Sequence, residues 1–473
     1  MTSKQIAKIH PRNELSSENP WGDDDFDRKS VGLMFENLLL NTPSPTTIAL
    51  KADWGTGKTT FLRRVAKSIE NETAVVFIDL WKADSATDPL AVIADELAKA
   101  VKEKRGFLAS LPSSAKQLGT KMADNASFLI ALTTGTASLL LGADSSTAAA
   151  IGSSSLKSAT AAVKWASDLN KKKRKVINAL SENLKALGKA VHANCQKPII
   201  IVLDEFDRCR PDFAVQTLER IKHYFDTSGY TFVLAIDDSA VASAVSGHYG
   251  GKLDGEKYLR RFFDYEFRLP PPSKQNVALF AASRLVNQND QPGVSANLKS
   301  FWKNSLVRLL NRNEDFSPDL KILAFSAIFA EAMALSVRDQ LQATTLTFTL
   351  FRSMEKSNPM DPACLTFLCF ARFGNLVQFR LFEEGSLDFQ NLVRQFQGLN
   401  RVNSSIFDYF IEFGSALQLT SNEKGGRLNQ LPNRSSEDEF KRWGCMNAQY
   451  FGYGGNDGEQ YLRKHFFDLN RIA

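Results

Sequence analysis

Residues 52–59 have the composition of a loop that holds phosphate groups, with the sequence Ala-Asp-Trp-Gly-Thr-Gly-Lys-Thr. Small residues allow a tight turn in which consecutive backbone N–H groups point toward an anion. Lys58 would reach the β- and γ-phosphates of a nucleotide, and the hydroxyl of Thr59 would hold Mg²⁺. Ala52 stands where such loops have their first glycine, and it is the mildest replacement. We therefore predict a site for ATP with Mg²⁺ at this loop.

The segments on both sides of the loop fit this interpretation. Residues 46–51 are predicted to form a short apolar strand, and a helix is predicted to begin at Thr59. The N-terminus of that helix would add its dipole to phosphate binding. The residues predicted to contact the nucleotide are Trp54, Gly55, Thr56, Gly57, Lys58, Thr59 and Thr60.

Two carboxylates, Asp204 and Glu205, follow a second apolar segment. Residues 199–203 are branched and apolar throughout, which is typical of a strand buried on both faces of a parallel sheet. Such sheets present ligands at the C-terminal ends of their strands. We predict that Asp204 and Thr59 bind Mg²⁺, and that Glu205 activates the water that attacks the γ-phosphate. The alternative is a solvated acidic turn, which the adjacent loop at Lys58 disfavours.

A third predicted strand, residues 231–236, ends at Asp237. A polar side chain at that point would lie beside the γ-phosphate, so Asp237 is a candidate sensor. An ordinary turn aspartate is an equally good interpretation. With a helix expected over residues 211–225, the pattern predicts an α/β fold in which a parallel sheet is flanked by helices.

Several further motifs accompany these segments. The phosphate loop contains a tryptophan, a second predicted strand ends near Trp81, and the carboxylate pair continues as Asp-Glu-Phe-Asp-Arg-Cys-Arg-Pro. An Asp-x-x-Arg segment precedes the first strand, and a Tyr-Leu-Arg-Arg-Phe-Phe segment precedes a Leu-Pro pair. The segments concerned are residues 25–28, 53–59, 77–81, 204–211, 258–263 and 269–270. Together they resemble the KAP group of P-loop NTPases.

The resemblance covers about residues 20–355 and implies an ATPase. Members of the group are often bacterial and are often tied to phage defence or membrane signalling. We therefore expect a homo-oligomer with protein partners encoded in the same defence operon. Two residues depart from the group's pattern, namely Ala52 in place of glycine and Glu205 where many members have a second aspartate. The glutamate is nearer the usual hydrolytic base.

Four arginines are candidates for coupling the nucleotide to other parts of an assembly. Arg208, Arg260 and Arg261 follow strand ends or precede the lid, and such positions often face a neighbouring subunit in ring-forming or paired ATPases. An arginine supplied in trans would stabilise the charge on the γ-phosphate. Asp207 could instead hold Arg208 in a structural pair. Arg338 resembles the second sensor of AAA-type lids, with a plain surface arginine as the alternative.

The chain divides into four predicted segments. The spacing between Lys58 and Asp204 exceeds what one strand and its helices need, so residues from about 106 to 190 are predicted to be a helical insertion. Helices are expected to begin after Ser317 and Ser336, within a lid. The segments are a polar N-terminal segment (1–30), the P-loop NTPase core with its insertion (31–272), a helical lid (273–355) and a C-terminal helical domain (356–473).

The insertion contains one stretch, residues 125–143, without any charged residue and with about the length of a membrane span. Small and hydroxyl-bearing residues dilute it, so we favour a helical hairpin that packs in the protein, with membrane contact as the alternative. The basic run at residues 171–175 is most often a solvated helix face, and contact with nucleic acid or anionic lipid is the other interpretation.

Composition is that of a folded enzyme: 473 residues, 43% hydrophobic, with a formal net charge of +6. Five cysteines without a CxxC pair disfavour a metal cluster and fit a reducing compartment. Because the first 19 residues lack an apolar run, we expect a cytoplasmic protein, or one associated with the inner membrane through residues 125–143. An ATPase is the preferred function, and a nucleotide-gated scaffold with little turnover and a DNA-stimulated ATPase are the alternatives.

Overall fold

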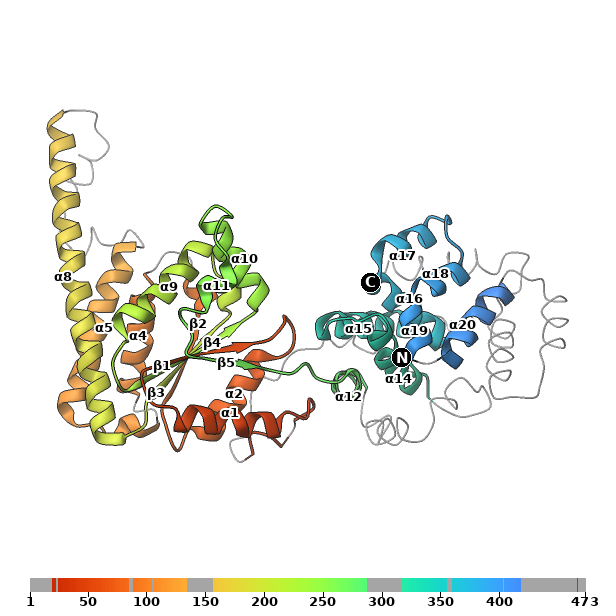
Figure 1. Cartoon of the computed structure of the whole chain (residues 1–473), viewed down its shortest axis with the longest axis horizontal. Coiled ribbons are helices and arrows are strands. Elements are labelled where there is room, and N and C mark those ends of the chain that lie inside the picture. Colours follow the sequence, from red (N-terminus) through yellow and green to blue (C-terminus); the bar gives the residue numbers. More distant parts are fainter. Residues whose placement is uncertain are drawn as a thin grey trace. The chain divides into compact units, whose positions relative to one another are not determined.

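The computed structural model of the protein (Figure 1) describes residues 19–84 apart from 23, 88–103, 106–133, 156–286, 317–354, 360–417 apart from 403, and residue 466. The chain forms two compact units. One, the sheet unit, contains Arg28–Pro270, and the other, the helical unit, begins at Pro271 and includes Asp24–Asp27. The predicted domain limits stay predictions.

The sheet unit is built on five parallel strands in the order β2-β3-β4-β1-β5. This confirms the predicted α/β fold with a parallel sheet flanked by helices. The short strand β5 is an addition to the strands expected from the sequence. The strands are β1 (Thr46–Lys51), β2 (Val75–Asp79), β3 (Ile199–Asp204), β4 (Tyr230–Ile236) and β5 (Tyr265–Arg268).

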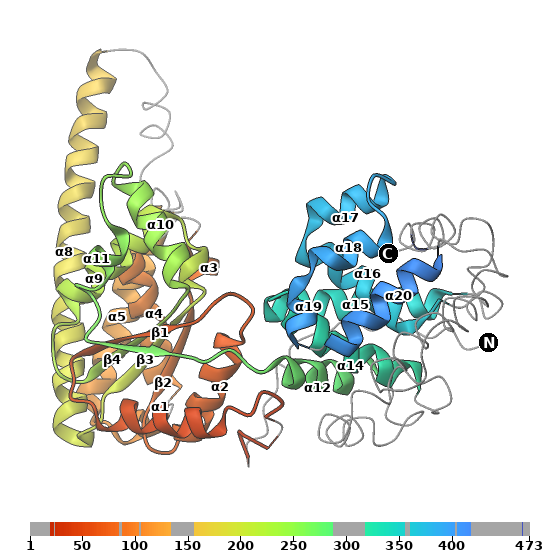
Figure 2. The same cartoon turned by 45° about the vertical axis from the view of Figure 1, so that its right-hand side comes forward.

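Both faces of the sheet are covered by helices (Figures 1 and 2). Successive side chains of a strand point to opposite faces, and in β3 Ile201 packs in the core beneath α4 and α9, whereas Ile200 packs in the core shared with α1 and α2. The helices of this unit are α1 (Lys29–Asn41), α2 (Lys58–Ile69), α3 (Leu80–Ala83), α4 (Pro89–Lys102), α5 (Ser113–Thr133), α8 (Leu156–Cys195), α9 (Pro211–Tyr224), α10 (Asp238–His248) and α11 (Gly255–Leu259).

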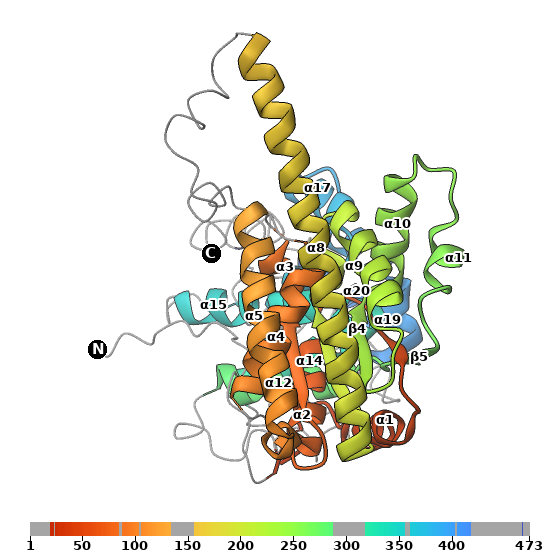
Figure 3. The same ribbon diagram turned by 90° about the vertical axis from the view of Figure 1, so that its left-hand side faces the viewer.

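The described part of the insertion consists mainly of α5, which packs against α4, and α8, which packs against α5 and α9, on one face of the sheet (Figure 3). At Gly188 of α8, a Cβ atom would come within 2.6 Å of the Ser228 carbonyl oxygen and 2.7 Å of the Tyr230 ring. The Tyr230 hydroxyl donates a 2.7 Å hydrogen bond to the Leu184 carbonyl. The C-terminal half of α8 is therefore packed tightly against the start of β4.

Only the beginning of the uncharged stretch at 125–143 is described. Ala126 and Leu129 are fully buried in the core of the sheet unit, and residues 134–143 lie outside the described residues. Within the described ranges, no helix has the length and the hydropathy that crossing a bilayer requires. The basic run at 171–175 lies on α8, where four of its five side chains are exposed and Lys171 pairs with Asp168 at 3.7 Å.

The helical unit has one core rich in phenylalanine, formed by rings such as Phe329, Phe367 and Phe410. This core joins helices from the predicted lid and from the predicted C-terminal domain. The helices are α12 (Lys274–Leu285), α14 (Pro318–Ala332), α15 (Val337–Ser353), α16 (Pro362–Gly374), α17 (Leu376–Glu383), α18 (Phe389–Gln395), α19 (Gln397–Val402) and α20 (Ser404–Leu417).

Helices begin after Ser317 and Ser336 as predicted, and each serine caps its helix. The Ser317 hydroxyl accepts a hydrogen bond from the Leu320 N–H. The Ser336 hydroxyl accepts from the Asp339 N–H at 3.1 Å and donates to the Asp339 carboxylate at 2.7 Å, as in a capping box. Arg338 follows in the first turn of α15 and is exposed. Its role as a sensor stays a prediction.

Asp361, the N-cap of α16, is a buried carboxylate in the helical unit. It accepts hydrogen bonds from the N–H groups of Ala363 and Cys364 and from the Tyr409 hydroxyl. Burial raises the pKa of this carboxyl, against the effects of the Cys364 N–H and of the charge on Lys321. The side chain therefore caps α16 and also accepts from a buried hydroxyl on α20.

Replacing Asp361 by alanine is expected to lower the free energy of unfolding by about 2–4 kcal/mol, because a helix cap is lost and buried donors lose their acceptor. Asp361→Asn retains an acceptor for the backbone N–H groups and is the matched control, with a smaller loss. Urea unfolding of the full chain, followed by circular dichroism, measures both. Equal stability of Asp361→Ala and wild type would contradict the role.

Candidate active site

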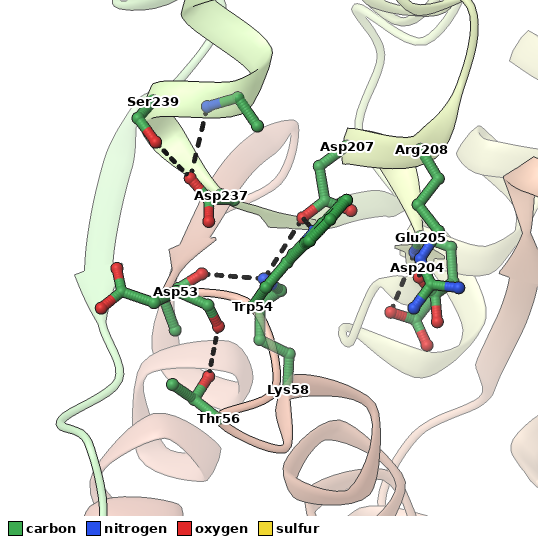
Figure 4. A network of polar contacts seen from close by, with 12 residues as sticks. Asp53, Trp54, Thr56, Lys58, Asp204, Glu205, Asp207, Arg208, Asp237 and Ser239 are labelled. Carbon is green, nitrogen blue, oxygen red and sulfur yellow. Dashed lines mark hydrogen bonds and ion pairs between the residues drawn. The ribbon is translucent and has the colours of Figure 1, made fainter. Parts of the chain in front are cut away.

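The predicted phosphate loop connects β1 to α2 at the C-terminal edge of the sheet (Figure 4). Gly55 and Gly57 have φ angles of 78° and 89°, which a residue with a Cβ adopts only with strain. Gly57 is the N-cap of α2 and has no side chain to cap its N–H groups. The helix therefore begins with N–H groups that no capping side chain satisfies, as an anion site requires.

Lys58, the first residue of α2, reaches back across the loop. Its ammonium donates to the Ala52 carbonyl at 2.8 Å and forms an ion pair with Asp207 at 3.3 Å. Its side chain is 11% exposed, so the charge lies inside the loop rather than in solvent. The ammonium of Lys58 is thus held at the phosphate loop, and its contact with the β- and γ-phosphates stays a prediction.

Arg28 fixes the outer side of the same loop. Its guanidinium donates to the Thr56 carbonyl at 2.7 Å and to the Pro270 carbonyl at 2.8 Å, and the residue is 4% exposed. In the sequence this arginine is only the last residue of the Asp-x-x-Arg motif, which predicts no function for it. Its contacts show that it ties the phosphate loop to the end of the sheet unit.

Asp204 ends β3 beside the loop, close enough to the Thr59 side chain for the hydroxyl to affect its carboxyl group. Burial raises the pKa of the Asp204 carboxyl, and the contact with Thr59 opposes this rise. A hydroxyl beside a buried carboxylate is a pair of hard oxygen ligands, which Mg²⁺ prefers. The two residues therefore fit the predicted metal, since a divalent cation would compensate the charge of Asp204.

Glu205 follows directly and has φ 57° and ψ 29°, an uncommon conformation for a residue with a side chain. Its carboxylate forms a 2.6 Å ion pair with Nε of Arg208. Burial raises the pKa of Glu205, the charge of Arg208 opposes this, and Asp204 and Asp207 add to the rise. Strained backbone at such an edge is frequent at functional sites.

Asp207 is a second residue of this site for which the sequence predicted no role there. Its carboxylate is 2% exposed and accepts from both Lys58 and the Trp54 indole, the latter at 2.8 Å. The alternative considered for Arg208, a structural pair with Asp207, is not what the structure has, because Arg208 pairs with Glu205. Residues 206–208 form a single 3₁₀ turn, in which neighbouring side chains point apart. The sequence signal that could have predicted Asp207 is its spacing of three residues from Asp204.

Asp237 lies on the side of Lys58 away from Asp204 and Glu205 (Figure 4). It caps α10, accepting from the Ser239 hydroxyl at 2.7 Å and the Ala240 N–H at 3.3 Å. Burial acts to raise the pKa of Asp237, but these hydrogen bonds and the charge of Lys58 hold it below its ordinary value. Asp237 therefore caps α10 while its charge interacts with that of Lys58, and its role as a sensor stays a prediction.

Arg260 and Arg261 are exposed and lie away from their own chain's loop. They precede β5, whose first residue pairs with Ile48 near the start of β1. The phosphate loop follows the other end of β1, so these arginines approach the opposite edge of the sheet. The Arg261 carbonyl accepts from Lys222 at the end of α9. The structure does not bring them to the site within one chain, and their action in trans stays a prediction.

Comparison with known families agrees with this geometry. A sequence model described as the KAP family P-loop domain matches residues 34–318. No curated protein matches the chain. The matched range includes the loop at Lys58, the carboxylates that end β3, and all five strands. The chain therefore belongs to the KAP family of P-loop NTPases.

Proposed function

We propose that this protein is an Mg²⁺-dependent ATPase whose nucleotide cycle drives assembly or conformational change. One observation carries the proposal. The sheet brings Lys58, from the loop after β1, to the same edge as Asp204 and Glu205, from the end of β3, with Thr59 in contact with Asp204. Phosphoryl transfer needs this combination of a cationic cradle, a metal-binding carboxylate and a base.

Each residue has one task in the proposed reaction. The loop N–H groups and Lys58 bind the β- and γ-phosphates, and Thr59 and Asp204 would hold Mg²⁺. The metal, when bound, neutralises charge on the phosphate oxygens. Glu205 accepts a proton from the water that attacks the γ-phosphate, and the products are ADP and inorganic phosphate. We assign Asp204 to the metal rather than to the base because it is buried next to Thr59, whereas Glu205 is only partly buried.

A nucleotide-gated scaffold with little turnover is the second candidate. The observation that favours it is the 2.6 Å ion pair between Arg208 and Glu205, since a base held in an ion pair is less available to a water molecule. We further propose a cytoplasmic homo-oligomer that acts with protein partners in antiphage defence. This context is supported only by what the family resemblance implies.

Phosphate release from ATP by the purified full chain tests the proposal. We expect turnover with Mg²⁺ and none after chelation by EDTA, because Thr59 and Asp204 would then lack their ion. Tight ATP binding with negligible turnover would favour the scaffold instead. Absence of ATP binding would contradict both.

A further inference from the structure

A continuous series of contacts joins the phosphate loop to the base. Lys58 pairs with Asp207 at 3.3 Å, and the same carboxylate oxygen accepts from the Trp54 indole at 2.8 Å. The Arg208 guanidinium lies over the Trp54 ring, 5.8 Å from its centre, and pairs with Glu205 at 2.6 Å. Figure 4 shows these residues side by side. Each residue of the series therefore contacts the next one, from Lys58 to Glu205.

The ion pair with Asp207 uses the Lys58 ammonium, which a γ-phosphate would also need. The Asp207 carboxylate is buried, at 2% exposure, and is compensated by Lys58. If Lys58 turns to phosphate oxygens, Asp207 becomes a buried charge without its counter-ion and close to further negative charge. An unpaired buried charge costs several kcal/mol. The Lys58 ammonium has three N–H donors, of which the Ala52 carbonyl and Asp207 use two. The β-phosphate of ADP can take the third donor and leave the pair with Asp207 intact, whereas ATP also needs the donor that Asp207 uses, so Asp207 must move when a triphosphate binds.

Movement of Asp207 acts directly on Trp54, because it removes the acceptor of the indole N–H. Trp54 is 48% exposed, so little packing holds it in place otherwise. The Arg208 guanidinium lies over two rings, 5.8 Å from the centre of Trp54 and 5.4 Å from the centre of Trp81. If the Trp54 ring moves away, Arg208 loses one of its two cation–π contacts. Phe206 is 1% exposed and anchors the turn, so the change is confined to side chains.

We propose that Asp207, Trp54 and Arg208 are positioning residues that hold Glu205 in an ion pair until a γ-phosphate displaces Asp207 from Lys58. The proposal rests on triphosphate binding at the loop, and it adds a way in which the site distinguishes ATP from ADP. Arg208 then leaves Glu205, and the carboxylate becomes available to the attacking water. The relay consists entirely of residues of the sheet unit.

Tryptophan fluorescence of the full chain provides the spectroscopic test. With Mg²⁺ present, the non-hydrolysable ATP analogue AMP-PNP should change the emission, because the Trp54 indole loses its hydrogen bond, and ADP should not. Trp54→Phe should lose most of this difference, although the chain has six tryptophans. Equal spectra with ADP and AMP-PNP, in a protein that binds both by calorimetry, would overturn the relay and leave the proposed ATPase intact.

Kinetics of two variants separate positioning from a purely structural role. Asp207→Asn retains an acceptor for Trp54 but frees Lys58, so ATP should bind about tenfold more tightly, the effect of one charge-assisted hydrogen bond. Arg208→Gln should raise kcat several-fold with little change in KM. A fall in kcat would instead identify Arg208 as a group that the reaction requires and would refute the relay.

Lys82→Gln is the matched control. Lys82 is an exposed cation at the same edge of the sheet, but its ion-pair partner is Asp79, at 2.8 Å, and it acts on Glu205 only through its charge, not through an ion pair. It should leave both the kinetics and the spectral difference between nucleotides unchanged. A rise in kcat equal to that of Arg208→Gln would show a general effect of surface charge and would contradict the specific pair.

Discussion

Glu205→Gln is expected to bind ATP as tightly as wild type and to hydrolyse it about 10²–10⁴-fold more slowly, the range over which general bases act. The amide keeps the size of the side chain but cannot take a proton from water. Folding should be little affected, since a partly exposed ion pair such as that with Arg208 contributes at most about 1 kcal/mol. Calorimetry measures the affinity, and single-turnover phosphate release measures the chemical step.

Glu219→Gln is the control for this substitution, because it makes the same chemical change at an exposed position of α9. It should hydrolyse ATP at the wild-type rate. If Glu205→Gln retained substantial hydrolysis, Glu205 would not be the base, and the same experiment on Asp204→Asn would become the next measurement.

The second large effect concerns the neighbouring subunit. Arg260→Ala together with Arg261→Ala is expected to lower kcat by about 10³–10⁵, which is what an arginine supplied in trans contributes where one is used. Both side chains are exposed near the edge of the sheet opposite their own loop, so an effect of this size requires a second chain. Activity per chain should also rise with protein concentration.

Mixing two inactive variants gives the sharper form of this test. Glu205→Gln mixed with the double arginine variant should recover some activity, because some interfaces then join an intact base to intact arginines. Lys252→Ala with Lys257→Ala, two exposed cations on the adjacent segment, should behave as wild type. Constant activity per chain on dilution into a demonstrably monomeric state would rule out the trans arrangement.

The sequence was sufficient for elements whose signal is local. β3 is an unbroken apolar run and β1 leads into a glycine-rich turn, so both were predicted, as were the helix starts after Ser317 and Ser336. β5 was missed because among its four residues only Phe267 is buried, so no apolar run marks it. Such a short edge strand forms because it pairs with its neighbour β1, and its own composition does not predict it.

Side-chain partners were harder to predict than backbone elements. The pairing of Asp207 with Lys58 joins residues far apart in the sequence, and it depends on the direction that a 3₁₀ turn gives each side chain. The same turn sends Arg208 to Glu205 rather than to the adjacent Asp207. Arg28 likewise acts through carbonyl groups, which carry no sequence signal.

Calorimetric titration of ATP with Mg²⁺ tests the central claim most directly, that the loop binds a triphosphate through Lys58. It is done in the Glu205→Gln background, so that hydrolysis does not obscure the heat of binding. Adding Lys58→Ala should weaken binding at least about tenfold, because the cation that pairs with the phosphates is lost. Circular dichroism confirms that the variant is folded. Equal ATP affinity with and without Lys58 would contradict the account.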